Sequence, residues 1–144
     1  GSEMCIRDSH NIMSEIEYKH QKDYVINEYM LRGIINNDDK NTINNYINQI
    51  ISHEYLSNFF SKKNTIYNER EIFVPPDKVI VPDKISVSAD NQFSILDYKT
   101  GGKKTDHISQ IKNYASALKK ANFRVKDVFL VYVKNKIEVL KIDC

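Results

Sequence analysis

The sequence predicts an α/β fold in which a mixed β-sheet is flanked by helices and preceded by a helical segment. Apolar residues recur three and four positions apart from residue 10 to about residue 60, which is typical of amphipathic helices. Beyond residue 62 the pattern changes to the alternation that marks β-strands. One helical stretch, residues 106–121, interrupts the strands, so the predicted order is helices followed by βββαββ.

The helical segment, residues 10–62, is expected to hold three helices and one short further helix over residues 53–60. The third helix is predicted to begin near Asn41, with Asp38 or Asp39 as its N-cap. A sheet of five strands should follow, because apolar and polar residues alternate in five stretches: 66–74, 79–87, 93–98, 128–133 and 137–142. The last two are joined by a tight turn over residues 134–136.

Length and composition fit a single domain over residues 10–144, because 144 residues with 41% hydrophobic content can fill one core. We interpret residues 1–9, GSEMCIRDS, as a tag or artefact, since Gly-Ser is a common expression scar. No apolar run reaches the length of about 20 residues needed to cross a bilayer, and no secretory signal is present. Cys5 and Cys144 stand alone, which excludes a CxxC zinc site or a four-cysteine iron–sulfur cluster. We therefore expect a soluble, cytoplasmic protein.

Three charged residues break the apolar pattern of two neighbouring strands. Asp97 and Lys99 are two positions apart on one strand, so both side chains point to the same face. Asp83 lies on the preceding strand, and an antiparallel turn between the strands can bring it opposite Asp97. Two carboxylates about 5 Å apart repel by roughly 3 kcal/mol at an intermediate dielectric, and a divalent cation removes that repulsion. Oxygen ligands suit Mg²⁺ or Mn²⁺, and Lys99 would neutralise developing charge on a phosphate.

Taken alone, an Asp-x-Lys pair is more often a solvated surface pair than a catalytic one. The ordered set of motifs changes that balance: Pro82-Asp83-Lys84, then Asp97-Tyr98-Lys99-Thr100-Gly101, then Gln110-Ile111-Lys112-Asn113-Tyr114 on the following helix. With these motifs the chain resembles the RecB-like nuclease domain of the PD-(D/E)XK superfamily, found at the end of helicase–nucleases of the RecBCD and AddAB type. The resemblance covers nearly all of the chain from His10 onward.

The resemblance implies a restriction-endonuclease-like core and a set of site residues. It makes Asp83 and Asp97 metal ligands and Lys99 the catalytic lysine. It also implies that the main-chain carbonyl of Tyr98 is a further ligand and that His10 is an additional metal-binding histidine, although a frayed terminal histidine is an equal alternative. The acidic residue of the first strand is Glu69 or Glu71, which share a face by alternation, and we favour Glu69. A second Pro-Asp-Lys ends at Lys78, but its Asp77 falls in a turn.

DNA contacts are expected from the last helix and from the lysines around it. Gln110 and Tyr114 are four positions apart, so they share one helix face. We expect them to touch DNA near the scissile phosphate, although Tyr114 is also a plausible core residue. Basic residues near this helix would contact the phosphate backbone without reading sequence: Lys103, Lys104, Lys112, Lys119 and Lys120. The net charge of +2 is too small for binding by overall charge alone, so a local patch would have to supply these contacts.

Two hypotheses follow for function. In the first, the chain is a Mg²⁺- or Mn²⁺-dependent deoxyribonuclease, an exonuclease in DNA end processing and recombinational repair, partnered by a helicase domain or subunit. In the second, it is an inactive DNA-binding or scaffold module that retains the same fold. The sequence has no GxxxxGK[ST] motif, so ATP hydrolysis by that route is not expected. Neither a membrane nor an iron–sulfur cluster is expected as a partner or cofactor.

Overall fold

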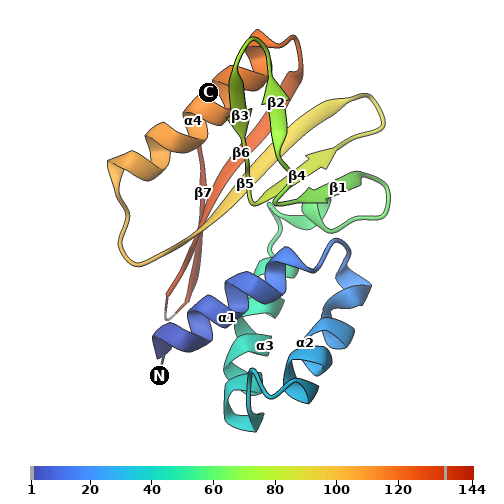
Figure 1. Cartoon of the computed structure of the whole chain (residues 1–144), viewed down its shortest axis with the longest axis vertical. Helices are drawn as coiled ribbons and strands as arrows, with labels where there is room; N and C mark the ends of the chain where they lie inside the picture. The colour runs from blue at the N-terminus through green and yellow to red at the C-terminus, as the bar shows by residue number, and fades with distance from the viewer. Residues whose placement is uncertain (1, 135) are drawn as a thin grey trace.

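The computed structural model describes residues 2–134 and 136–144, with side chains described from Arg7 onward. It has a mixed five-stranded β-sheet covered by helices, in agreement with the α/β class that the sequence predicts (Figure 1). The expected turn over residues 134–136 includes Asn135, which lies outside the described residues. Within the described part of the chain, no helix combines the length and the apolar content required to cross a bilayer.

Helices occupy the first part of the chain, and Figure 1 shows α1, α2 and α3 grouped together on one side of the sheet. The elements are α1 (Ser2–Ser14), the short 3₁₀ helix η1 (Lys19–Gln21), α2 (Lys22–Leu31), α3 (Asn37–Ile51) and the 3₁₀ helix η2 (Ser57–Phe59). Helix α1 runs through the segment interpreted as a tag or artefact, and Ser9 within it is buried. The origin of that segment stays a prediction.

Two details of the helical segment differ from the sequence prediction. Helix α3 begins at Asn37 rather than near Asn41, and its N-cap is Asn36, whose side-chain oxygen accepts a hydrogen bond of 2.9 Å from the main-chain N–H of Asp39. Asp38 and Asp39 lie in the first turn instead, where negative charge interacts favourably with the helix dipole. The short helix predicted over residues 53–60 is reduced to η2.

The described residues form seven strands rather than the five predicted, because two predicted strands are each broken in two. The strands are β1 (Thr65–Asn68), β2 (Ile72–Val74), β3 (Lys78–Ile80), β4 (Lys84–Val87), β5 (Gln92–Thr100), β6 (Arg124–Val133) and β7 (Ile137–Lys141). The first break falls at Glu69, whose φ of 48° is left-handed and cannot continue a strand. The second falls at Val81 and Pro82, and proline has no N–H to donate to a ladder.

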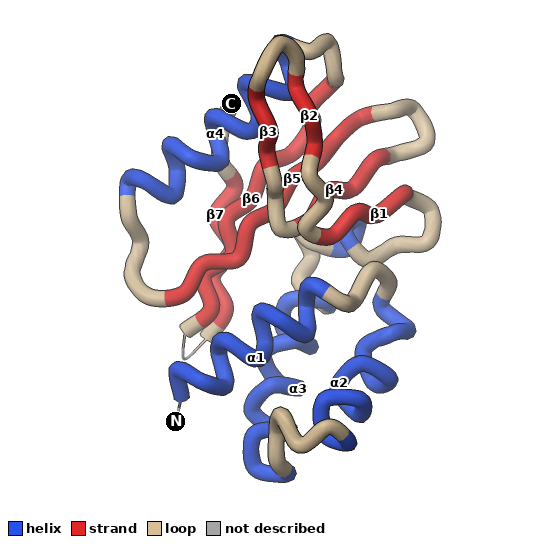
Figure 2. Tube along the Cα trace, viewed as in Figure 1, coloured by secondary structure: helices blue, strands red, loops and turns tan. Residues whose placement is uncertain are grey.

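The main sheet has the strand order β1-β4-β5-β6-β7, and β2 and β3 form a separate antiparallel hairpin. Strands β5 and β6 pair in parallel, whereas the other neighbours are antiparallel. Helix α4 (Thr105–Lys120) makes the crossover that a parallel pair requires. Figure 2 shows the hairpin standing over the sheet on the side of α4.

Apolar side chains cover both faces of the sheet and form two clusters. On one face, Leu96 and Val131 pack against the N-terminal helices, which contribute residues such as Ile47. On the other face, Ile95 and Leu130 pack against α4 and against the buried residues of the β2–β3 hairpin. Because successive residues of a strand point to opposite faces, β5 and β6 supply both clusters. The sheet is therefore buried between two layers.

Candidate active site

Two hydrogen bonds from main-chain N–H groups to carboxylate oxygens connect Asp83 and Asp97 at the point where β4 begins beside β5. The N–H of Asp83 donates to Oδ1 of Asp97 at 2.8 Å, and the N–H of Tyr98 donates to Oδ2 of Asp83 at 2.8 Å. Each carboxylate thus accepts a hydrogen bond from the backbone next to the other. The structure brings these two predicted site residues together as the antiparallel β4–β5 pairing requires.

Lys99 and Gln110 extend the site from Asp97 toward α4. The Nζ atom of Lys99 lies 3.5 Å from Oδ2 of Asp97 and donates a hydrogen bond of 2.7 Å to Oε1 of Gln110. Asp97 is 3% exposed, whereas Lys99 is half-buried, so the ammonium group lies nearer to solvent. The Asp-x-Lys spacing predicted that both side chains share a face, and the contact with Asp97 agrees with it.

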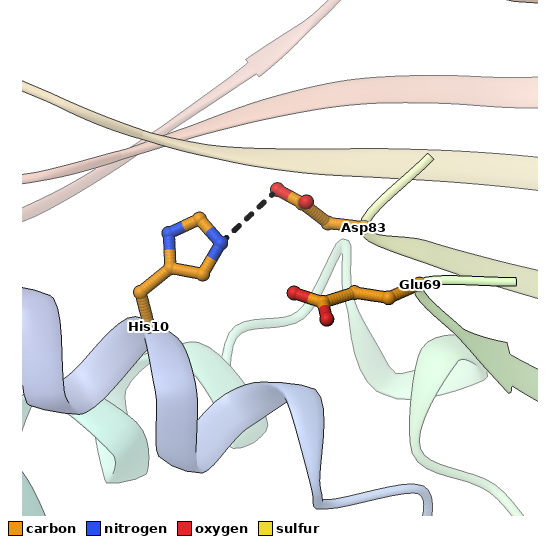
Figure 3. A group of neighbouring side chains, drawn as sticks. All are labelled: His10, Glu69 and Asp83. Atoms are coloured by element: carbon orange, nitrogen blue, oxygen red, sulfur yellow. Dashed lines mark ion pairs between the residues drawn. The ribbon is translucent and has the colours of Figure 1, made fainter. Parts of the chain in front are cut away.

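His10, Glu69 and Asp83 form a second, adjoining group whose side chains converge (Figure 3). One ligand atom from each residue lies within 4.8 Å of the others, and Nε2 of His10 is 3.6 Å from Oδ2 of Asp83. The imidazole of His10 also packs edge-on against the ring of Tyr98, with 5.7 Å between ring centroids. An imidazole nitrogen and two carboxylates can hold a divalent cation, and the two carboxylates supply the oxygen ligands that Mn²⁺ and Mg²⁺ prefer.

The cation-compatible group contains three of the predicted site residues, and the role of each as a metal ligand stays a prediction. Glu69, and not Glu71, joins His10 and Asp83, because the left-handed backbone at Glu69 breaks the alternation that would have kept the two glutamates on one face. Asp97 lies outside this group, with its oxygens directed to the Asp83 N–H and to Lys99. The carbonyl of Tyr98 as a ligand stays a prediction.

Burial and neighbouring charge shift two pKa values at the site. Desolvation, with repulsion from Asp83 as the second cause, raises the pKa of Asp97 to about 6. The hydrogen bond with Asp83 raises the pKa of His10 above its ordinary value, and burial opposes that shift. Asp83 contributes to both shifts, through its charge at Asp97 and through its hydrogen bond at His10. A bound cation would relieve the same repulsion.

Tyr98 belongs to β5 and Tyr114 to α4, and their side chains lie on opposite sides of the sheet. The hydroxyl of Tyr98 is buried on the side of the N-terminal helices and has no hydrogen-bond partner among the described residues. Tyr114 is half-buried beside the cluster under α4, and burial followed by the charge of Asp97 raises its pKa. Tyr114 thus packs partly against the core, and its contact with DNA stays a prediction.

The predicted DNA-binding lysines are exposed. Lys103 forms an ion pair with Glu138, and Lys104 occupies the N-cap position of α4. Lys119 donates a hydrogen bond of 2.9 Å to the main-chain oxygen of Cys144. All five lysines are solvent-accessible: Lys103, Lys104, Lys112, Lys119 and Lys120. Their exposure allows contact with a phosphate backbone. Lysines on an ordinary solvated surface are exposed to the same degree.

Sequence reasoning missed two polar residues directly beside the site, Asn68 and Lys84. Lys84 is fully buried, and its Nζ donates to the main-chain oxygen of Ile16 at 2.7 Å and to Oδ1 of Asn68 at 2.8 Å. Burial lowers the pKa of Lys84 to about 7. The alternation of the strand carries a signal for this. Ile85 packs in the cluster under α4, and successive residues point to opposite faces, so Lys84 points to the side that the N-terminal helices cover.

No protein-family model matches this chain, and no curated protein matches it. Any assignment of function therefore rests on the residues and geometry described above.

Proposed function

We propose that the chain is a Mg²⁺- or Mn²⁺-dependent deoxyribonuclease with the PD-(D/E)XK fold, related to RecB-like nuclease domains. The observation that carries the proposal is the adjacency of two groups at the β4–β5 junction. One is the cation-compatible group of His10, Glu69 and Asp83, and the other is the pair of Asp97 and Lys99. Carboxylates beside an amine are the arrangement that metal-assisted phosphodiester hydrolysis needs.

His10, Glu69 and Asp83 would hold the cation, and Asp97 adjoins them through its hydrogen bond with the Asp83 N–H. A divalent cation there would supply Lewis acidity toward the scissile phosphate and a lower pKa for an attacking water. The residues themselves fit this role because one ligand atom from each of His10, Glu69 and Asp83 lies within 4.8 Å of the others, and two of the three are carboxylates. Lys99 would place its ammonium group against the negative charge that develops on the phosphate.

Helix α4 would orient the substrate beside these groups. Gln110 holds the Nζ of Lys99 at 2.7 Å, so it fixes the direction of that ammonium group. Tyr114, one turn further along the same face, would contact the nucleotide next to the scissile phosphate. Lys103 and Lys104 precede the helix and would contact the phosphate backbone, which gives binding without sequence specificity. The natural context we propose is cytoplasmic DNA end processing and recombinational repair together with a helicase domain or subunit.

The proposal is tested by cleavage of end-labelled linear single- and double-stranded DNA with Mg²⁺ or Mn²⁺. We expect Asp83→Ala, Asp97→Ala and Lys99→Ala each to lower the rate by at least about 100-fold, as removal of a group that stabilises transition-state charge does. The chain offers a matched control, because Asp77 stands in a second Pro-Asp-Lys sequence but in an exposed turn. Asp77→Ala should cleave at the wild-type rate.

Two outcomes would reject the nuclease proposal. Equal rates for the wild type and the three site variants would assign any cleavage to a contaminant. Absence of cleavage by the wild type with either metal, combined with retained DNA binding, would favour the inactive binding or scaffold module. Circular single-stranded DNA included in parallel distinguishes an exonuclease, which leaves it intact, from an endonuclease.

A further inference from the structure

A buried lysine lies between the N-terminal helices and the sheet. The Nζ atom of Lys84 donates to the main-chain oxygen of Ile16 and to Oδ1 of Asn68, and it lies 4.3 Å from the ring centroid of Phe60. The amide of Asn68 closes the network, because its Nδ2 donates to the same oxygen of Ile16 at 2.9 Å. Three segments that are distant in sequence thus meet at one carbonyl oxygen.

Packing alone does not account for a lysine at this place. Among the side chains that the structure describes, no carboxylate lies within ion-pair distance of the Lys84 Nζ. Its charge is therefore desolvated with only neutral hydrogen-bond acceptors and an aromatic ring as partners, which is costly. An apolar side chain of similar size would fill the same space, and replacing buried charges in this way is often neutral or stabilising. The segments that the hydrogen bonds of Lys84 connect therefore indicate what this residue does.

The three segments joined by this network are those that carry the three members of the candidate cation group. Lys84 directly follows Asp83, and Asn68 directly precedes Glu69. Ile16 lies just past the end of α1, six residues after His10. Lys84 and Asn68 are also paired across β1 and β4, and the N–H of Glu69 donates to the oxygen of Asp83 at 3.0 Å, so the two strands are already locked together.

What the β1–β4 ladder does not fix is the position of α1, and hence of His10, relative to the two acids. The bonds from Lys84 and Asn68 to the Ile16 oxygen are the polar contacts that tie the end of α1 to the strands carrying these acids. They lie near the imidazole along the chain, because His10 is four residues from the end of α1 at Ser14, a helical rise of about 6 Å, and Ile16 follows two residues later. We propose that Lys84 is a positioning residue that fixes α1 against β1 and β4 and so places His10 beside Glu69 and Asp83 for cation binding.

This inference rests on the cation group of the proposed function but not on DNA cleavage, so it is tested by metal binding. The dissociation constant for Mn²⁺ is measured by electron paramagnetic resonance on the wild type and on Lys84→Met. We expect binding to weaken by about 10- to 100-fold, the usual cost of losing a group that orients metal ligands. The direction of the change is decisive, because loss of whatever positive charge Lys84 carries would by Coulomb's law strengthen cation binding rather than weaken it.

Ile47→Val is the control, because Ile47 is fully buried in the cluster under the same helices and its apolar side chain takes no part in the hydrogen bonds of Lys84 and Asn68. It should lower the unfolding temperature slightly and leave the Mn²⁺ dissociation constant unchanged. If Lys84→Met does not give a cooperative unfolding transition, the Mn²⁺ dissociation constant is measured on Asn68→Ser instead. This variant removes the hydrogen bond from Asn68 to Ile16 and keeps the buried lysine.

The outcomes separate this inference from the proposed function. Equal or tighter Mn²⁺ binding by folded Lys84→Met overturns the positioning role and leaves the nuclease proposal intact. Weaker binding by the variant, with no cleavage by the wild type, supports the positioning role and rejects the nuclease. Absence of Mn²⁺ binding by the wild type overturns the positioning role together with the cation site.

Discussion

Asp97 shows how burial of a single carboxylate affects the stability of the fold. Its carboxylate is almost completely buried, and its pKa of about 6 exceeds the ordinary value of 3.8 because of desolvation first and repulsion from Asp83 second. A folded-state pKa above the unfolded one means that the folded protein binds more protons between the two values. The contribution of Asp97 to stability is therefore fully present below about pH 4 and is lost as the pH rises through about 6.

We expect Asp97→Asn to be more stable than the wild type near neutral pH in the absence of metal. The gain in the free energy of unfolding should be about 1–3 kcal/mol, because each pKa unit corresponds to about 1.4 kcal/mol and the new amide can still accept the Asp83 N–H. Urea unfolding with a chelator, measured from about pH 4 to about pH 7, checks it. The two proteins should converge at the acidic end, and parallel curves would show that Asp97 titrates normally.

At the residue scale, sequence reasoning identified Asp83, Asp97 and Lys99 but not the hydrogen bonds that orient them. Strand alternation placed Asp97 and Lys99 on one face, and helix spacing placed Gln110 toward them, because both depend on short-range geometry. The hydrogen bonds that orient Asp83 and Asp97 come from main-chain N–H groups of neighbouring segments, which residue spacing does not report. Lys84 was missed for a related reason: its partner is the carbonyl of a residue 68 positions away.

At the scale of elements, the regions with an unbroken period were predicted well. Helix α4 and strand β5 match residues 106–121 and 93–98 closely, because each has one period and clear turn signals at its ends. The predicted strands 66–74 and 79–87 were wrong in extent, since alternation continues through Glu69 and Val81 while the backbone does not. Periodicity reports which face a residue prefers, and it does not report a left-handed residue that redirects the chain.

The β2–β3 hairpin that results from these breaks has one buried and one exposed face, which gives a paired prediction. Ile80 is 1% exposed and packs in the cluster beneath α4, whereas Phe73 is 62% exposed. Ile80→Ala should lower the free energy of unfolding by about 2–5 kcal/mol. Phe73→Ser should change it by no more than about 0.5 kcal/mol. Urea unfolding of both variants checks the pair, and a large loss in Phe73→Ser would mean that the hairpin face is covered in solution.

At the scale of the whole molecule, one sheet supplies both apolar clusters. Neighbouring residues of β6 alternate between them, as Leu130 lies under α4 and Val131 lies against the N-terminal helices. Neither layer of helices can detach without exposing one face of a sheet that is apolar on both sides. The helical segment 10–62 and the sheet segment 63–144 should therefore unfold together, although their sequence patterns differ.

We expect one cooperative unfolding transition, and a substitution in either apolar cluster should lower its free energy of unfolding. Ile47→Ala and Leu118→Ala each remove a fully buried side chain from a different cluster and should each cost about 2–5 kcal/mol. In the double variant the two losses should add, because the residues lie in separate clusters on opposite faces. Circular dichroism and tyrosine fluorescence followed through urea unfolding check this, and their curves should coincide for every variant. If Ile47→Ala instead separates an early loss of helix from a later loss of the sheet, the two segments are independent units, and the site formed by His10 and Asp83 is assembled by docking rather than by folding.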